Sequence, residues 1–385
     1  MDISRRNLLR RIGAAAAGTA AIPSLAEASL SAGFGEPWPI SGTSPSGGPI
    51  RLDRNENAYG PSSNAIAAMQ EAARTVACRY PEVESEALRN TIARFHGVPS
   101  EQVVLGCGSG EILRMAADAF LGFRKKLIVA QPTFELMADC GQRAGAEVVT
   151  IPLTHDYSHD LSAMLARSDP ATGLVYICNP NNPTGTLTPR RDLEAFIRQL
   201  PKTTFVLIDE AYHHYVGESS DYASFVDRPI DDNRVIVTRS FSQIYGLAGM
   251  RVGYGVAAPQ TALLLAACRL PDGVNVVAAR AAAAALDDPE HMRLCLARNA
   301  DDRQEFFNQS HARMLKPIDS QTNFVMMNTG RPAVEILEHF KKNNVLVSGP
   351  IPAFRSHIRV SLGSQADMRQ FWRVWDLMPA HRMSM

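Results

Sequence analysis

The sequence lacks a net charge, closely spaced cysteines and an apolar run long enough to cross a membrane. Its 39 Lys and Arg side chains balance its 39 Asp and Glu side chains, which excludes the basic footprint of a nucleic-acid-binding protein. The six cysteines are scattered without a C-x-x-C pair, so we expect no metal site and small, reduced, mostly buried thiols. No internal repeat is present. A small molecule is therefore the expected partner.

The first thirty residues have a different character from the rest. The letters SRRNLL at residues 4–9 are a twin-arginine signature, and residues 12–22 form a short Ala/Gly-rich apolar stretch. An AEA cleavage site follows at residues 26–28. A frayed amphipathic helix is the alternative. The order of these features predicts a Tat signal peptide over residues 1–28, a periplasmic protein and no stable membrane insertion after signal removal.

Strand and helix patterns alternate through the middle of the chain. Residues 29–49 are rich in Gly, Ser and Pro, and we expect an N-terminal arm or linker over residues 29–62. Short apolar runs then predict strands at residues 103–105, 127–130, 147–151, 174–178, 204–208, 235–238 and 252–257. Helical periodicity lies between most of them, as at residues 112–120 and 188–200. We therefore expect an α/β fold with a mostly parallel central sheet in a large domain at residues 63–270.

The C-terminal part predicts a smaller α/β unit after a helical connection. Residues 259–313 are dominated by helical patterning, including an Ala-rich stretch at residues 276–286. Strands are predicted at residues 324–327, 345–347 and 358–361, with helices at 333–342 and 365–377. Residues 271–385 are thus expected to form an interdomain helix and a small C-terminal domain.

Four segments carry polar residues at the ends of predicted strands. They are GCGSGE at residues 106–111, NPNNPTG at 179–185, LIDEAY at 207–212 and SFSQIYGLAGMRVGY at 240–254. Glycines before a helix expose backbone N–H groups that suit a phosphate, although such a turn is often only structural. Asp209 at the tip of a buried strand needs a cationic partner, and Arg251 with two hydroxyls suits a phosphate dianion. The segments together indicate a site for a phosphate-bearing, cationic small molecule.

In their order and spacing these segments resemble the fold-type I pyridoxal 5′-phosphate (PLP)-dependent aminotransferases of class I and II. LDRNENAYGP at residues 52–61 and RYP at 79–81 are similar to the histidinol-phosphate aminotransferase branch in particular. The resemblance spans roughly residues 50–375. It implies the large and small domains of that fold, PLP as cofactor, an amino acid and a 2-oxo acid as partners, and a homodimer with shared active sites.

The resemblance also implies residue roles. The residues expected to hold the PLP phosphate are Gly108, Ser109, Gly110, Ser240, Ser242 and Arg251, with Tyr59 reaching the phosphate of the neighbouring subunit. Asp209 would pair with the pyridinium nitrogen, which strengthens the ring as an electron sink. Asn182 and Tyr212 would bind the 3′-oxygen.

Three further residues complete the expected site. Phe134 would stack on the cofactor ring. Arg359 would grip the substrate carboxylate in a bidentate manner, and Asn323 would line the same pocket. Ser348 stands where the histidinol-phosphate branch usually has an arginine, which argues against histidinol phosphate as the substrate.

The pattern breaks at one position, because the family has its Schiff-base lysine three residues after Ser240 and this chain has Gln243. A carboxamide is neither a nucleophile nor a base near neutral pH, and loss of a positioned base typically costs about 10²–10⁴-fold in rate. Gln243 is an engineered trap, a natural loss of transamination, or part of an altered chemistry with another proton carrier. His213, His214 and Tyr245 lie near in sequence, and we expect the two histidines to face elsewhere.

The sequence therefore predicts an aminotransferase-type enzyme whose activity is impaired or altered by Gln243. A PLP-dependent decarboxylase of the same branch remains an alternative. So does a non-catalytic periplasmic protein that binds PLP, pyridoxamine phosphate or their amine adducts.

Overall fold

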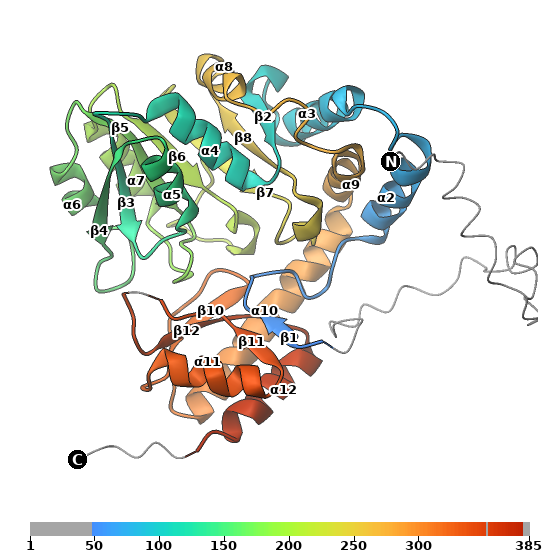
Figure 1. Ribbon diagram of the computed structural model, residues 1–385, viewed down its shortest axis with the longest axis vertical. Helices are drawn as coiled ribbons and strands as arrows, with labels where there is room; N and C mark the ends of the chain where they lie inside the picture. The colour runs from blue at the N-terminus through green and yellow to red at the C-terminus, as the bar shows by residue number, and fades with distance from the viewer. Residues whose placement is uncertain (1–47, 352, 380–385) are drawn as a thin grey trace, which may run out of the picture. The chain divides into compact units, whose positions relative to one another are not determined.

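The computed structural model describes residues 48–351 and 353–379 (Figure 1). Its largest element is a seven-stranded sheet in the order β2-β8-β7-β6-β5-β3-β4. The strands are β2 (Val103–Gly106), β3 (Lys126–Gln131), β4 (Glu147–Pro152), β5 (Thr172–Cys178), β6 (Phe205–Asp209), β7 (Val235–Ser240) and β8 (Gly253–Ala257). Only β8 runs antiparallel to its neighbours, so the predicted mostly parallel sheet is confirmed.

Helices cover both faces of this sheet, which explains why its strands are continuous apolar runs. Along β5, Leu174 and Tyr176 face one core and Val175 and Ile177 face the other, as the two-residue period of a strand requires. The first core is closed by α4 (Ser109–Phe120), α5 (Leu136–Arg143) and α8 (Pro259–Ala267). The second is closed by α2 (Ser63–Thr75), α3 (Glu82–His96), α6 (Leu161–Ala166), α7 (Arg190–Gln199) and α9 (Val276–Leu286).

A separate, smaller core is built mainly from the C-terminal part of the chain. Its strands form an antiparallel sheet, β12-β10-β9, and a parallel pair, β1-β11. Their bounds are β1 (Ile50–Leu52), β9 (Lys316–Pro317), β10 (Phe324–Asn328), β11 (Val345–Val347) and β12 (His357–Ser361). The helices are α10 (Pro289–Ala312), α11 (Ala333–Lys342) and α12 (Gln365–Asp376). Helix α10 contributes Cys295 to the large core and Phe306 to this one.

The predicted strands and helices all occur, within about two residues at most ends. Strands β1 and β9 were not predicted, because two or three residues carry too little periodicity to be recognised. β1 lies within the predicted arm, and its Ile50 pairs with Val345. The predicted signal peptide lies outside the described residues, and the boundaries at residues 62/63 and 270/271 stay predictions.

Two expectations about composition can be compared with the structure. All six cysteines are free, but only Cys140, Cys178 and Cys295 are buried, while Cys78 is exposed. Three of the six thiols are therefore buried, whereas most were expected to be. Within the described ranges, no helix is both long and apolar enough to span a membrane, and no cluster of residues there has the composition of a metal site.

Candidate active site

The polar segments meet at one edge of the large sheet. β5, β6 and β7 are adjacent and parallel, and they end at Cys178, Asp209 and Ser240. The NPNNPTG and SFSQ turns therefore leave the sheet next to Asp209, beyond the carboxyl ends of the strands where ligands of open α/β sheets bind.

A cavity of about 600 Å³ lies at this edge. Its lining includes most residues predicted from the sequence, namely Ser109, Gly110, Phe134, Asn182, Asp209, Tyr212, Ser240, Ser242, Gln243, Arg251 and Arg359. A second cavity of about 600 Å³ between α10 and α12 contains none of them. The concentration of motif residues, rather than volume, therefore identifies the candidate active site.

The first turn of α4 and Arg251 form an anion-binding corner. Ser109 and Gly110 open α4, where the first backbone N–H groups have no partner within the helix. Gly108, just before the helix, has φ +78°, and a Cβ atom there would overlap the guanidinium of Arg251. Arg251 Nη1 lies 3.4 Å from Ser242 Oγ. Gly108 thus does not line the cavity itself but leaves the space in which Arg251 lies.

Asp209 is a buried carboxylate that has no cationic partner among the described residues. Its side chain is almost completely enclosed and accepts hydrogen bonds from the Tyr176 hydroxyl, at 2.9 Å, and the Ala211 backbone N–H, at 3.1 Å. Burial raises the pKa of Asp209 to about 6, and these two hydrogen bonds oppose that rise. A carboxylate held in this way has a strong requirement for a cation.

Tyr212 is held by residues from distant parts of the chain. The Asn55 amide donates to the Tyr212 hydroxyl at 2.9 Å, and the Asn55 backbone N–H donates to Ser361 Oγ at 2.8 Å. Burial raises the pKa of Tyr212 to about 12, against the opposing effect of Arg359. Its hydroxyl is therefore protonated at neutral pH and can act as a hydrogen-bond donor.

Arg359 on β12 carries into the cavity a positive charge that forms no ion pair with any described residue. Its Nη1 donates to Asn182 Oδ1 at 2.6 Å and its Nη2 to the Asp53 carbonyl at 2.7 Å, and both acceptors are uncharged. Its Nε is buried without a partner within the described part of the chain. Burial lowers the pKa of Arg359. Such a guanidinium is suited to an incoming carboxylate.

Gln243 lies on a turn that is fixed from outside the cavity. Its carbonyl accepts from the Gly246 N–H at 2.9 Å, and the carbonyl of Ile244 accepts from the Asn57 amide at 2.9 Å. Gly246 has φ +67°, and a Cβ atom there would overlap the Gly60 backbone. The segment around Asn57 and Gly60 therefore packs closely against the turn that presents Gln243.

Besides Gly108, two predicted site residues lie outside the cavity lining. Asn323, expected in the substrate pocket, instead donates to the backbone carbonyls of Asn55, at 3.0 Å, and Glu56, at 3.3 Å, and so holds the segment that lines the site. Asn323 is not among the residues that line this cavity, and its role toward the substrate stays a prediction. Tyr59 donates its hydroxyl to Asp302 of its own chain. Its expected role in a neighbouring subunit stays a prediction.

Sequence reasoning missed the residues that act across long sequence distances. Tyr176 positions Asp209, while Asn55, held by Ser361, positions Tyr212. None of the three belongs to a strand-end motif, although Asn55 lies in the LDRNENAYGP segment. A signal did exist for Tyr176. A tyrosine in the middle of a fully buried strand must find a partner for its hydroxyl.

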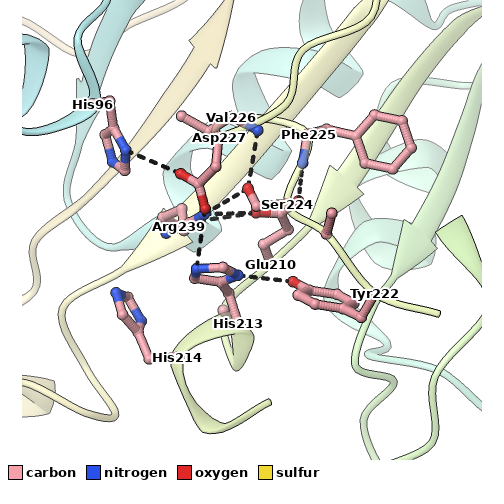
Figure 2. Close-up of polar contacts among 12 residues, drawn as sticks. His96, Glu210, His213, His214, Tyr222, Ser224, Phe225, Val226, Asp227 and Arg239 are labelled. Carbon is pink, nitrogen blue, oxygen red and sulfur yellow. Dashed lines mark hydrogen bonds and ion pairs between the residues drawn. The ribbon is translucent and has the colours of Figure 1, made fainter. Parts of the chain in front are cut away.

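A second polar cluster is formed by Arg239 of β7 and by residues that follow β6, and none of its labelled residues lines the cavity (Figure 2). Arg239 and Glu210 are both fully buried, and Arg239 Nε lies 3.0 Å from Glu210 Oε2. Arg239 also donates to Ser224 Oγ at 2.6 Å, and Ser224 donates to Glu210 at 2.6 Å. The cluster is thus internally satisfied, with its buried positive and negative charges paired.

His213 and His214 belong to this cluster and do not line the cavity. His213 lies between Tyr222, whose hydroxyl is 3.0 Å from Nδ1, and Asp227, whose carboxylate is 3.6 Å from Nε2. Burial, with help from Arg239, lowers the pKa of His213 to about 3, while Asp227 opposes this. The expectation that the two histidines face elsewhere is confirmed.

The fold and this site together define a PLP-dependent transferase of fold type I. A family model for aminotransferase class I and II matches residues 48–374, and the chain belongs to that family. It is 36% identical to histidinol-phosphate aminotransferase of Moorella thermoacetica over 84% of each chain. It is 39% identical to the enzyme of the same name from Methylobacillus flagellatus, over 84% of this chain and 87% of that one.

A solved structure of similar fold contains the cofactor. Histidinol-phosphate aminotransferase from Sinorhizobium meliloti in complex with pyridoxal 5′-phosphate has a TM-score of 0.79 and 27% identity, over 85% of this chain and 91% of that one. Aspartate aminotransferase from Thermus thermophilus, at 20% identity and a TM-score of 0.74, shares the fold. The chain is thus an aminotransferase whose family uses PLP.

The residues present in the cavity fit this cofactor. The corner of α4, Ser242 and Arg251 suits a phosphate, and the unpaired carboxylate of Asp209 suits a pyridinium nitrogen. Asn182 and Tyr212 line the same cavity, and Arg359, which donates to Asn182, suits a carboxylate of the substrate. When bound, PLP supplies an electron sink for bonds at the substrate Cα. The chain itself supplies binding, orientation and exclusion of water.

Proposed function

We propose that this protein is an aminotransferase of the histidinol-phosphate aminotransferase branch whose transamination is impaired because Gln243 occupies the position of the Schiff-base lysine. The observation that carries the proposal is the cavity lining. Gln243 shares it with Asp209, Tyr212 and Arg359, and no lysine or histidine occurs in it within the described part of the chain.

The residues near Gln243 do not replace the missing base. Proton transfer at the substrate Cα needs a group whose pKa lies near the working pH. The pKa of Tyr212 is raised to about 12, so its hydroxyl is a poor base at neutral pH. Asp209 is enclosed and is needed to pair with the ring nitrogen. Tight cofactor binding with slow or absent turnover is the expected behaviour.

An amino acid and a 2-oxo acid are the proposed substrates, because Arg359 offers an unpaired guanidinium for an α-carboxylate. Several relatives are named histidinol-phosphate aminotransferases. Ser348, however, offers no positive charge where that branch usually has arginine, and it pairs with Arg359 through the backbone. We therefore propose an amino-acid substrate other than histidinol phosphate.

The proposal includes export by the Tat pathway, a periplasmic location and a homodimer. The twin-arginine sequence at residues 4–9 supports export. A second candidate function is a non-catalytic binding protein for PLP, pyridoxamine phosphate or their amine adducts, which the absence of a base in the described cavity lining favours.

Purified protein loaded with PLP and mixed with a panel of amino acids tests these functions. We expect at most slow release of keto acid from this protein and at least about a hundredfold faster release from Gln243→Lys, the smallest effect of restoring a positioned base. Release of CO₂ instead would identify a decarboxylase. Tight cofactor binding with no product from either protein would support the binding protein, and failure of both proteins to bind PLP would refute the proposal.

A further inference from the structure

Gln243 presents a buried hydrogen-bond acceptor that nothing in the described part of the chain satisfies. Its Oε1 atom is enclosed and has no partner there, although the side chain lines the cavity. The backbone of its turn is fixed through Gly246 and Asn57, which keeps the base of the side chain at the cavity wall. A buried acceptor of this kind gains most from a donor supplied by a ligand.

The charged groups that line the cavity do not by themselves favour a cation or an anion beside Gln243. The lining contains three carboxylates, which are Asp53, Glu56 and Asp209. It contains three guanidinium groups, which are Arg54, Arg251 and Arg359. These charges balance. A lysine in place of Gln243 would add a positive charge that repels a ligand ammonium, whereas the carboxamide adds none and offers an acceptor.

We propose that the cavity binds the amine form of the cofactor, pyridoxamine 5′-phosphate, more tightly than the aldehyde form, and that Gln243 sets this preference by accepting a hydrogen bond from the 4′-ammonium. The inference rests on the proposed function, which puts Gln243 beside the 4′ substituent. The protein then keeps its cofactor in the form that carries the amino group.

The two cofactor forms differ only at the 4′ position, so the other contacts cancel in the comparison. Both offer the same phosphate to Arg251 and the same ring nitrogen to Asp209. An ammonium forms a charge-assisted hydrogen bond with the Gln243 oxygen, while an aldehyde can only accept a weaker, neutral one from its amide nitrogen. The difference between these bonds corresponds to about a tenfold difference in affinity.

The test is an equilibrium titration of the cofactor-free full-length protein with three ligands. They are pyridoxamine 5′-phosphate, PLP and 4′-deoxypyridoxine 5′-phosphate, which has a methyl group at the 4′ position. We expect the amine to bind about tenfold more tightly than either of the others. Equal affinities of the amine and the methyl compound would overturn the inference and leave the proposed function standing. Binding of none of the three would overturn both.

Matched variants at one position sharpen the test, with folding checked by circular dichroism. Gln243→Glu keeps the size and adds a negative charge, so the preference for the amine should increase. Gln243→Met removes the acceptor, so the amine and the methyl compound should bind equally. Gln243→Lys should reverse the order in favour of PLP. A preference for the amine that is unchanged in Gln243→Met would assign it to another residue and refute the role of Gln243.

Discussion

Asp209 and Glu210 are neighbours in the chain, but their carboxylates lie in opposite electrostatic environments. Asp209 faces the cavity with no cation among its described neighbours, and burial raises its pKa to about 6. Glu210 faces the cluster of Figure 2, where it is paired with Arg239 and hydrogen-bonded by Ser224. The alternation of side chains at the end of β6 separates the two.

The same contrast exists between two arginines. Arg239 is paired with Glu210, and although burial alone would lower its pKa, its acidic neighbours outweigh that effect and raise it. Among the described residues the hydrogen bonds of Arg359 go to neutral oxygens, and burial lowers its pKa. The protein thus pairs its buried charges where they are structural and leaves them unpaired where a ligand is to bind. Unpaired charges reduce the stability of the folded chain.

The largest expected effect comes from breaking the structural pair. Arg239→Met should reduce the free energy of unfolding by about 3–5 kcal/mol, because it leaves the Glu210 carboxylate buried without a cation. Urea unfolding of the cofactor-free protein measures this. The double variant Arg239→Met/Glu210→Gln should recover most of the loss. A loss below about 1 kcal/mol in the single variant would contradict the comparison.

The opposite sign is expected at Asp209. Since its folded pKa of about 6 exceeds the ordinary 3.8, its ionisation is unfavourable in the fold, and stability falls as the pH rises from 3.8 through 6. Asp209→Asn should therefore be up to about 3 kcal/mol more stable than the parent protein at pH 7 and similar to it below pH 4. The same variant should bind PLP more weakly. Equal stability of both proteins across this range would contradict the prediction.

The histidines of the cluster predict acid sensitivity. The folded pKa of His213, about 3, lies below the ordinary 6.5, so its neutral form is favoured in the fold and stability is lost as the pH falls below 6.5. Between pH 7 and 5 this single group should cost about 2 kcal/mol.

Urea unfolding of His213→Gln at both pH values checks this. The variant should lose less stability on acidification than the parent protein does. His155→Gln, a change of the same kind at a fully exposed position, is measured alongside as the control. Identical pH dependences for His213→Gln and the parent protein would refute the prediction.

The smallest effect on stability is expected at Arg359. Arg359→Met removes two hydrogen bonds but also an unpaired buried charge, so the free energy of unfolding should change by less than about 1 kcal/mol. Binding of amino acids or 2-oxo acids to the PLP-loaded protein, followed by absorbance, should be lost. A loss of stability as large as that in Arg239→Met would contradict the contrast, because both arginines would then contribute equally to the stability of the fold.

The sequence could predict those parts of the fold and site that depend on local patterns. Strand β5 is a continuous apolar run, and Asp209 and Ser240 directly follow such runs, so their place at one sheet edge was predictable. The contacts of Asn55 with Ser361 were not, because they join residues 306 positions apart. Nor could the pattern tell which of Asp209 and Glu210 would find a cation, since that depends on Arg239 from another strand.

The contacts of β1 and Asn55 with strands β11 and β12 have a consequence for biosynthesis. Strand β1 pairs with β11, and Asn55 reaches Tyr212 while being held by Ser361. A nascent chain that has not yet released residue 361 from the ribosome can form most of the large sheet but cannot fix Asn55, Arg359 or the carboxylate-binding side of the cavity. Completion of the active site therefore requires that β12 has been synthesised, and a chain truncated before β12 should accumulate as a folded sheet without a working ligand site.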